Sequence, residues 1–273
     1  MTKKFKLCTP NGTKEKKQDL IMHKTNNTKR AIIVGATSGI GKEVAILLAK
    51  KGWKVGIAGR RFEPLSELRH EHAGIEEIEV IDITKPDAPQ LLLKLIEKLG
   101  GIDLYFHSSG IGYQNPSLDM EKECATVHTN AYGFTQMIIT AFNHFLSHPE
   151  KKCHLAAISS IAGTKGLGAA PAYSSTKRYI NHYLQCLRQL CSIRRISHIR
   201  IHDIRPGFVK TPLLTDGGRY PMQLDVKDVA EKIVKGIENN KSVITIDWKY
   251  RILVAFWRLI PNFIWVNLRI SSK

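Results

Sequence analysis

The hydrophobic and polar positions of this chain alternate in blocks between residues 31 and 247. The run AIIVGA, at residues 31–36, is apolar and ends in glycine, which is typical of a buried parallel strand. KEVAILLAKKG follows with apolar residues at helical spacing and Gly52 as its stop signal. The same alternation predicts further strands at 53–59, 75–82, 102–110, 154–160, 198–207 and 242–247, and helices at 64–72, 87–101, 122–147, 172–193 and 225–240.

This alternation contains no internal repeat and no linker, so it indicates one doubly wound α/β domain with a mostly parallel sheet. We expect the domain to span residues 29–248. Residues 1–28 have little apolar content and no periodicity, which predicts a basic, disordered arm. Residues 249–273 form a Trp- and Arg-rich amphipathic extension. In sheets of this kind, ligands bind beyond the carboxyl ends of the strands.

The positive charge of the chain is concentrated at its two ends. The formal net charge is +17, of which residues 1–30 carry +7 and residues 249–273 carry +5. Such ends favour an anionic surface such as nucleic acid or anionic lipid, although a solvated tail explains the same charge. Because residues 1–30 lack aromatic platforms and a reading motif, we do not expect a nucleic-acid partner.

Cysteine and histidine spacing argues against a disulfide framework and against a metal site. The five cysteines are an odd set without a C-x-x-C pair and suit a reducing cytoplasm. The histidine pairs with metal-like spacing lack the carboxylates or cysteines of a tetrahedral site, so no metal is expected. No apolar region follows the N-terminal lysines, and no run of about 18 apolar residues occurs. These features predict a cytoplasmic protein, with peripheral contact at the inner membrane face left open.

The segment GATSGIG, between the first strand and the first helix, has the composition of a phosphate-binding turn. A backbone that approaches a pyrophosphate has no room for Cβ atoms, and the following helix offers free N–H groups and its positive end. A plain structural turn is the alternative for a glycine loop taken alone. The residues expected to hold the phosphates are Gly35, Thr37, Ser38, Gly39, Ile40 and Gly41.

Two arginines, Arg60 and Arg61, end the second strand about twenty residues after the glycines. An acidic residue here would accept from the ribose 2′-OH of NAD, which arginine cannot do. Arginines bind a 2′-phosphate through charge-assisted hydrogen bonds, so we expect NADPH to be preferred over NADH. Asp82, after the third strand, is a candidate acceptor for the adenine amine, with a turn or helix-entry aspartate as an equal alternative.

The pentapeptide YSSTK places Tyr173 and Lys177 four residues apart at the start of a predicted helix, on one face. A free tyrosine titrates near about 10, and a neighbouring ammonium is expected to lower that pKa toward the range of efficient proton transfer. Ser160, thirteen residues before Tyr173, ends a strand where its hydroxyl can steady a carbonyl oxygen. The Tyr/Lys spacing alone is a frequent accident, but its combination with the glycine loop makes coincidence a poor explanation.

With these motifs the chain resembles the short-chain dehydrogenase/reductase family from about Lys29 to Asp247, which implies a Rossmann fold. The resemblance rests on GATSGIG, Asp82, Asn130, Ser160, YSSTK and RPGFVKT at 205–211. It implies hydride transfer between nicotinamide and a carbonyl or alcohol carbon. The implied catalytic residues are Asn130, Ser160, Tyr173 and Lys177. The implied cofactor contacts beyond the glycine loop and Arg60, Arg61 and Asp82 are Ser109, Gly110, Tyr173, Lys177, Pro206, Gly207, Val209 and Thr211.

The resemblance also assigns roles. It makes Tyr173 the proton donor to the carbonyl oxygen, which Ser160 orients. Lys177 would hold the nicotinamide ribose and lower the pKa of Tyr173, and Asn130 would support a water relay. One segment departs from the family pattern, because His107-Ser108 stands where the family usually has two asparagines that tie adjacent strands. This departure is interpreted as a subfamily variation and not as a loss of activity, because all four implied catalytic positions are filled. A cofactor-sensing protein that binds NADP(H) without turnover is kept as the alternative function.

The apolar stretch RILVAFWRLIPNFIW, at residues 251–265, lies outside this catalytic framework. Its tryptophans, aliphatic residues and arginines are typical of an interfacial amphipathic helix, and Arg258 and Pro261 end it well short of a membrane span. Two interpretations remain open, an interface in a homo-oligomer and contact with an anionic membrane surface. The stretch favours a hydrophobic or lipidic ketone as substrate, and LLTDGGRYPMQL, at 213–224, predicts a short lid.

Overall fold

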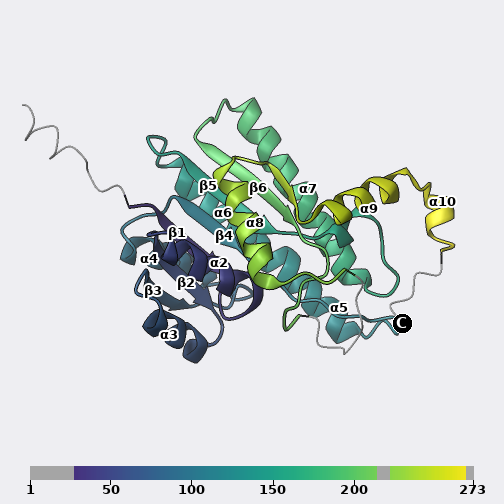
Figure 1. Cartoon of the computed structure of the whole chain (residues 1–273), viewed down its shortest axis with the longest axis horizontal. Helices are drawn as coiled ribbons and strands as arrows, with labels where there is room; N and C mark the ends of the chain where they lie inside the picture. Colours follow the sequence, from purple (N-terminus) through teal and green to yellow (C-terminus); the bar gives the residue numbers. More distant parts are fainter. Residues whose placement is uncertain (1–27, 214–221, 269–273) are drawn as a thin grey trace, which may run out of the picture.

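A sheet of parallel strands forms the centre of the protein (Figure 1). The computed structural model describes residues 28–213 and 222–268, and within them the sheet has seven strands in the order β3-β2-β1-β4-β5-β6-β7. The strands are β1 (Arg30–Val34), β2 (Lys54–Gly59), β3 (Ile75–Val80), β4 (Leu104–His107), β5 (Cys153–Ile158), β6 (Ile199–Arg205) and β7 (Val243–Thr245). All six pairings are parallel, which confirms the doubly wound α/β fold. Of the predicted arm at residues 1–28, positions 1–27 lie outside the described residues.

Helices cover both faces of the sheet, and the alternating strand residues explain why. Ile32 and Val34 face one hydrophobic cluster, which includes residues of α4 (Ala88–Lys98), α6 (Phe134–Leu146) and α7 (Pro171–Ile193). Ala31 and Ile33 face a second cluster, built with α2 (Gly39–Lys50), α3 (Phe62–Glu71) and α8 (Val226–Glu238). Because successive strand residues point to opposite faces, a strand that is apolar throughout fits a sheet covered on both sides.

The long helix predicted at 122–147 is divided into three parts in the structure. It consists of α5 (Met120–Val127), a π-helical turn (His128–Gly133) and α6. A π-helical turn accommodates an extra residue and often occurs at functional sites. Hydrophobic periodicity does not reveal this turn, because both flanking helices continue the same buried face.

The strand order places the start of the site at the sheet's topological switch point. β1 lies between β2 and β4, so the chain leaves β1 toward one side and β4 toward the other. Gly35 follows β1 and Ser108 follows β4, and the Ser108 backbone N–H donates to the Val34 carbonyl at 2.8 Å. The glycine loop and the segment after β4 are thus neighbours at the carboxyl edge of the sheet.

The C-terminal part of the described chain forms α9 (Trp248–Leu259) and α10 (Asn262–Trp265), which extend away from the sheet (Figure 1). The break at Ile260 and Pro261 confirms that the apolar stretch is interrupted where predicted. No helix among the described residues is long and apolar enough to cross a membrane. Tyr250, which we expected in the extension, is fully buried and packs with Ile161 and Val254.

Candidate active site

A cavity of about 1880 Å³ opens at the carboxyl edge of the sheet. It brings together most of the residues that the sequence predicted for cofactor and catalysis. Those lining it are Gly35, Thr37, Ser38, Gly39, Ile40, Arg60, Arg61, Asp82, Ser109, Gly110, Ser160, Tyr173, Lys177, Pro206, Gly207, Val209 and Thr211. Gly41 and Asn130 instead support this wall from behind, through the contacts described below.

The glycine loop is packed so closely that two of its positions exclude any Cβ. A Cβ on Gly35 would lie 2.5 Å from the Ser109 backbone nitrogen, and Gly35 also has a positive φ of 91°. A Cβ on Gly41 would lie 2.2 Å from the Gly35 carbonyl oxygen. The loop leads into α2, whose N-terminal residue Ser38 makes no capping hydrogen bond with its side chain. The positive end of α2 is therefore available to an anion, so these residues fit a pyrophosphate group.

The arginines and the aspartate that the sequence assigned to the adenosine half lie on the same wall of the cavity. Arg60 and Arg61 are exposed, and Arg61 Nη2 donates to Thr37 Oγ1 at 3.1 Å. Asp82 Oδ1 accepts from the Thr84 backbone N–H at 3.0 Å and from its hydroxyl at 2.8 Å. Burial raises the pKa of Asp82, but these bonds and nearby Arg60 and Lys85 outweigh it and leave the pKa lowered. Asp82 is therefore an ionised acceptor that forms a local turn with Thr84, which agrees with the turn interpretation, and its contact with adenine stays a prediction.

Helix α7 presents Tyr173 and Lys177 to the cavity from its first two turns. The Lys177 ammonium lies 5.6 Å from the centre of the Tyr173 ring and donates to the Ile158 carbonyl at 3.1 Å. The start of the helix is held by Glu123 of α5, whose carboxylate accepts from the Ala172 backbone N–H at 2.9 Å. A negative group at a helix N-terminus is stabilising, so α5 holds in place the part of α7 that carries Tyr173 and Lys177.

Burial changes the acid–base properties of this pair from those we expected. Desolvation raises the pKa of Tyr173, and a hydrogen bond with Ser160 only partly opposes it. Desolvation also lowers the pKa of Lys177 to about 8, against the attraction of the Asp203 carboxylate. The expected lowering of the tyrosine pKa is therefore absent in this state, because burial outweighs the neighbouring charge.

Ser160 lies two residues after the end of β5 and is buried beside the loop that follows β6. Its hydroxyl accepts from the Ala162 backbone N–H at 3.0 Å and donates to the Pro206 carbonyl at 3.4 Å. Together with the hydrogen bond to Tyr173, this orients the Ser160 hydroxyl into the cavity. The serine and the phenol can therefore reach one carbonyl oxygen.

Asn130 lies in the π-helical turn and is 1% exposed. Its side chain accepts from the Ile111 backbone N–H at 2.9 Å and donates to the Ile111 carbonyl at 2.7 Å. A Cβ on Gly110 would lie 3.2 Å from Asn130 Oδ1 and 3.6 Å from Lys177 Nζ, so both side chains converge behind this glycine. Asn130 thus fixes the segment after β4 next to Lys177.

His107, which replaces a family asparagine, is buried at the end of β4. Its Nδ1 lies 2.9 Å from the Tyr105 hydroxyl, and its ring contacts Phe134 edge-on. Burial and the charge of Lys177 lower the pKa of His107 to about 3, so the ring is neutral. The link between β1 and β4 is made by the backbone of Ser108. The backbone of Ser108 thus links the two strands, whereas the side chain of His107 bonds to Tyr105 of its own strand.

The C-terminal helices complete the cavity wall opposite the cofactor side. The Tyr250 hydroxyl accepts from the Phe208 backbone N–H at 3.1 Å and donates to the Met222 carbonyl at 3.0 Å. A Cβ on Gly207 would lie 2.2 Å from the Tyr250 ring. Gly207 therefore makes room for a side chain of α9, in addition to lining the cavity. Residues 214–221 of the predicted lid lie outside the described residues.

The C-terminal part of the described chain is hydrogen-bonded to the segment that precedes α7. Trp265 is buried, and its indole N–H donates to the Gly166 carbonyl at 2.7 Å. The Lys165 ammonium donates to the Ile260 carbonyl at 2.8 Å and to Asn262 Oδ1 at 2.9 Å. The apolar residues that line this part of the cavity are Tyr113, Leu167, Phe208, Leu213, Leu253, Trp257, Trp265, Val266 and Leu268.

Two residues with a clear place in this site were missed from the sequence. A Cβ on Gly112 would lie 2.3 Å from Tyr173 Cδ2, so the absence of a side chain there sets the position of the phenol. Asp203 is completely buried on β6. The sequence of that strand, IRIHDIR, already contains two arginines and a histidine, so no pattern along the chain singled out this acid. Among the described residues no three His, Cys, Asp or Glu side chains form a metal-binding group.

Comparison with known proteins agrees with this geometry. The model of the family described as short chain dehydrogenase matches residues 29–219. An uncharacterized oxidoreductase of Myxococcus xanthus is 30% identical over 242 residues, which are 86% of this chain and 93% of that protein. The 3-ketoacyl-(acyl-carrier-protein) reductase of Brucella melitensis, solved with NADH, superposes with a TM-score of 0.71 at 24% identity, over 80% of this chain and 96% of that one. An actinorhodin polyketide ketoreductase, solved with NADPH, superposes with a TM-score of 0.68 at 23% identity, over 81% of this chain and 97% of that one.

Proposed function

The chain belongs to the short-chain dehydrogenase/reductase family, and on that premise we propose that it uses NADPH to reduce the carbonyl group of an apolar, lipid-like substrate. As a member of this family it is an NAD(P)-dependent oxidoreductase that acts on the CH–OH/C=O pair. The observation that carries the proposal is the convergence of Ser160, Tyr173 and Lys177 on the same cavity as the glycine loop. The cavity continues beyond them into a wall of apolar side chains.

In the proposed reaction a bound nicotinamide would supply the hydride for the carbonyl carbon. Tyr173 donates its phenolic proton to the carbonyl oxygen, and Ser160 holds that oxygen by a hydrogen bond. Lys177 stabilises the phenolate that remains, because an ammonium 5.6 Å from the ring favours the charged form. Asn130 keeps the segment after β4 in place beside Lys177, through its two bonds to the Ile111 backbone.

The preference for NADPH rests on Arg60 and Arg61 at the end of β2. Both are exposed on the cavity wall, and Arg61 is oriented by Thr37 of the glycine loop. A hydrogen bond to a charged group contributes about 1.5–3 kcal/mol, so losing one phosphate contact weakens binding by roughly tenfold to a hundredfold. Replacing both arginines by serine is expected to raise the Kd for NADPH by at least about tenfold and leave the Kd for NADH nearly unchanged. Equal loss for both cofactors would contradict the assignment.

The decisive experiment follows NADPH and NADH consumption with a panel of aliphatic ketones and aldehydes of increasing chain length. We expect turnover with NADPH, kcat/KM that rises with chain length, and no turnover in Tyr173→Phe. Tyr179→Phe is the matched control, because Tyr179 is an exposed tyrosine of the same helix that bonds to Thr135 away from the cavity. NADPH binding without turnover on any probe, unchanged in Tyr173→Phe, would instead favour the cofactor-sensing alternative.

The outer face of α9 and α10 supports contact with an anionic lipid surface as part of this function. Apolar side chains that recur along this face are exposed, at Ile252 (48%), Phe256 (63%), Leu259 (77%) and Phe263 (72%). Exposed Lys249, Arg251 and Arg258 flank them, and residues 248–273 contain no acidic residue. An apolar face bordered by positive charge matches the interface of an anionic bilayer. The inner face of the same helices lines the cavity, so an apolar substrate has a direct route to it.

Flotation with vesicles of phosphatidylcholine and phosphatidylserine tests this contact. Deleting residues 249–273 is unsuitable because it removes buried Tyr250, so we choose the double variant Phe256→Asp/Phe263→Asp. Phe62→Asp is the control, because Phe62 is 53% exposed on α3. We expect the wild type and the control to float with anionic vesicles and the double variant to remain in solution. A concentration-dependent dimer that the double variant abolishes, without flotation of the wild type, would assign this face to a homo-oligomer instead.

A further inference from the structure

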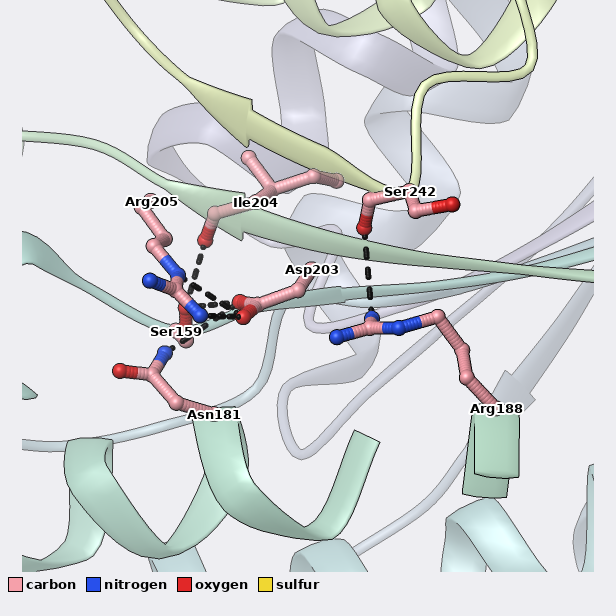
Figure 2. A network of polar contacts seen from close by, with 7 residues as sticks. All are labelled: Ser159, Asn181, Arg188, Asp203, Ile204, Arg205 and Ser242. Atoms are coloured by element: carbon pink, nitrogen blue, oxygen red, sulfur yellow. Dashed lines mark hydrogen bonds and ion pairs between the residues drawn. The ribbon is translucent and has the colours of Figure 1, made fainter. Parts of the chain in front are cut away.

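Asp203 on β6 is a completely buried carboxylate with hydrogen bonds on both of its oxygens (Figure 2). Its Oδ1 accepts from the Ser159 hydroxyl and from Asn181 Nδ2 at 3.3 Å. Its Oδ2 accepts from Arg205, at 2.8 Å from Nε and 2.5 Å from Nη2. A carboxylate that receives several donors, one of them charged, is stable in its ionised form even when it is buried.

Each partner of Asp203 is next to a residue of the proposed reaction. Ser159 precedes Ser160, which orients the carbonyl oxygen. Asn181 follows Lys177 by one turn on the same face of α7. Arg205 precedes Pro206, whose carbonyl accepts from the Ser160 hydroxyl and from the Ile161 backbone N–H. One carboxylate therefore joins the three segments that must keep their relative positions for the reaction.

We propose that Asp203 is a positioning residue that ties the end of β5, helix α7 and the loop after β6 together and supplies the negative charge behind Lys177. The proposal rests on the proposed function, because it gives Asp203 its role through Lys177 and Tyr173. Lys177 is 4% exposed, and the hydrogen bond it makes to Ile158 brings no negative charge. A buried ammonium is costly without an opposite charge, and Asp203 is the carboxylate whose attraction counteracts the desolvation of Lys177.

The other charges near this pair limit its effect and define the controls. Arg205 on β6 and Arg188 on α7 both lie in the field of Asp203, and Arg188 bonds to the Ser242 carbonyl at 3.3 Å. His107 is neutral and Tyr173 is uncharged until it transfers its proton. Removing the Asp203 charge therefore leaves Lys177 among cations, whereas removing the Arg205 charge leaves the negative charge of Asp203 less screened. The two halves of the same ion pair thus have opposite electrostatic effects on Lys177.

The test measures the protonation of Lys177 without requiring turnover. The protein is labelled with [13C]lysine, the Lys177 signal is assigned with Lys177→Met, and its titration midpoint is followed in Asp203→Asn and Arg205→Gln. We expect the midpoint to fall in Asp203→Asn and not to fall in Arg205→Gln. If it falls by one pH unit from about 8, the ammonium fraction at pH 8 decreases roughly fivefold. The pH profile of kcat for the best carbonyl probe is expected to move with the midpoint.

The outcomes separate this proposal from the proposed function and from a purely structural ion pair. An unchanged midpoint in Asp203→Asn, or an equal fall in both variants, would overturn the proposal even if the wild type turns over. If Asp203→Asn does not fold, the double variant Asp203→Asn/Arg205→Gln removes the unpaired arginine, and its midpoint must lie below that of Arg205→Gln alone. A wild type that lacks all turnover would refute the proposed function, and the titration of Lys177 would still decide the role of Asp203.

Discussion

Gly112 has no side chain and thereby sets the position of the Tyr173 phenol, the proposed proton donor, which makes Gly112→Ala a sharp test of the site. The added Cβ would lie 2.3 Å from Tyr173 Cδ2, 2.7 Å from Cε2 and 3.1 Å from Cγ. Ordinary carbon contacts begin at about 3.5 Å, so the ring or the Gly112 backbone must move by about 1 Å. A displacement of about 1 Å at a reacting group can lower the rate by about a hundredfold. We therefore expect kcat to fall by about that factor.

The assay is the rate of NADPH oxidation at saturating carbonyl probe, combined with the Kd for NADPH from fluorescence titration. Because Gly112 contacts the phenol, the Kd is expected to change by less than about threefold while kcat falls. Gly166→Ala and Gly168→Ala are matched controls, since both glycines line the same cavity and a Cβ on either meets nothing within 4 Å. A kcat for Gly112→Ala within twofold of the controls would refute the assignment of Tyr173 as the proton donor at this place.

Two further predictions concern the buried groups of the site. Tyr250→Phe removes the hydroxyl that bonds to the Phe208 N–H and to the Met222 carbonyl, so the free energy of unfolding in urea is expected to fall by about 2 kcal/mol. A fall no greater than that of Tyr179→Phe would contradict the role of Tyr250 in anchoring α9 to these two segments. The pKa of Lys177 falls from 10.5 to about 8 on folding, so the unfolded chain holds the proton more tightly than the folded protein does. This difference lowers the free energy of unfolding by about 3 kcal/mol below pH 8, and the loss disappears as the pH rises toward 10.5. Lys177→Met is therefore expected to abolish turnover but to be more stable than the wild type at pH 7, with a difference that shrinks by pH 10. A variant less stable than the wild type at pH 7 would show that the contacts of the Lys177 ammonium outweigh its desolvation.

The sequence predicted the parts of this site whose geometry is set by residues close to one another in the sequence. The glycine loop and the Tyr173/Lys177 pair each act within one turn or one helical repeat, so spacing alone indicates their geometry. The alternation of apolar and amphipathic segments predicted every strand of the sheet. β1 carries the continuous apolar run of a parallel strand buried on both faces, whereas β3 and β6 were indicated by isoleucines spaced among charged residues. Arg60 and Asp82 were placed correctly for the same reason, since each follows a strand.

The features that sequence reasoning missed depend on contacts between distant segments. Gly112 and Tyr173 are separated by about sixty residues, and nothing in either segment indicates that a ring packs on a glycine. The pKa of Tyr173 was misjudged because the sequence shows the neighbouring Lys177 charge but not the burial of the phenol, which raises the pKa. Tyr250 was assigned to a surface extension because its neighbours are apolar and basic, whereas only the fold shows that Gly207 leaves room for its ring.

The fastening of Trp265 and Lys165 also has a consequence for how the protein is synthesised. The glycine loop, Ser160 and Tyr173 leave the ribosome first, whereas Trp265 follows Lys177 by about ninety residues. At roughly 5–20 residues per second, the cofactor half has on the order of ten seconds to assemble before the last wall of the cavity exists. The exposed apolar side chains of α9 and α10 are also translated late. They therefore emerge after the strands of the sheet and the helices that cover it. This order shortens the time in which they are exposed to other nascent chains.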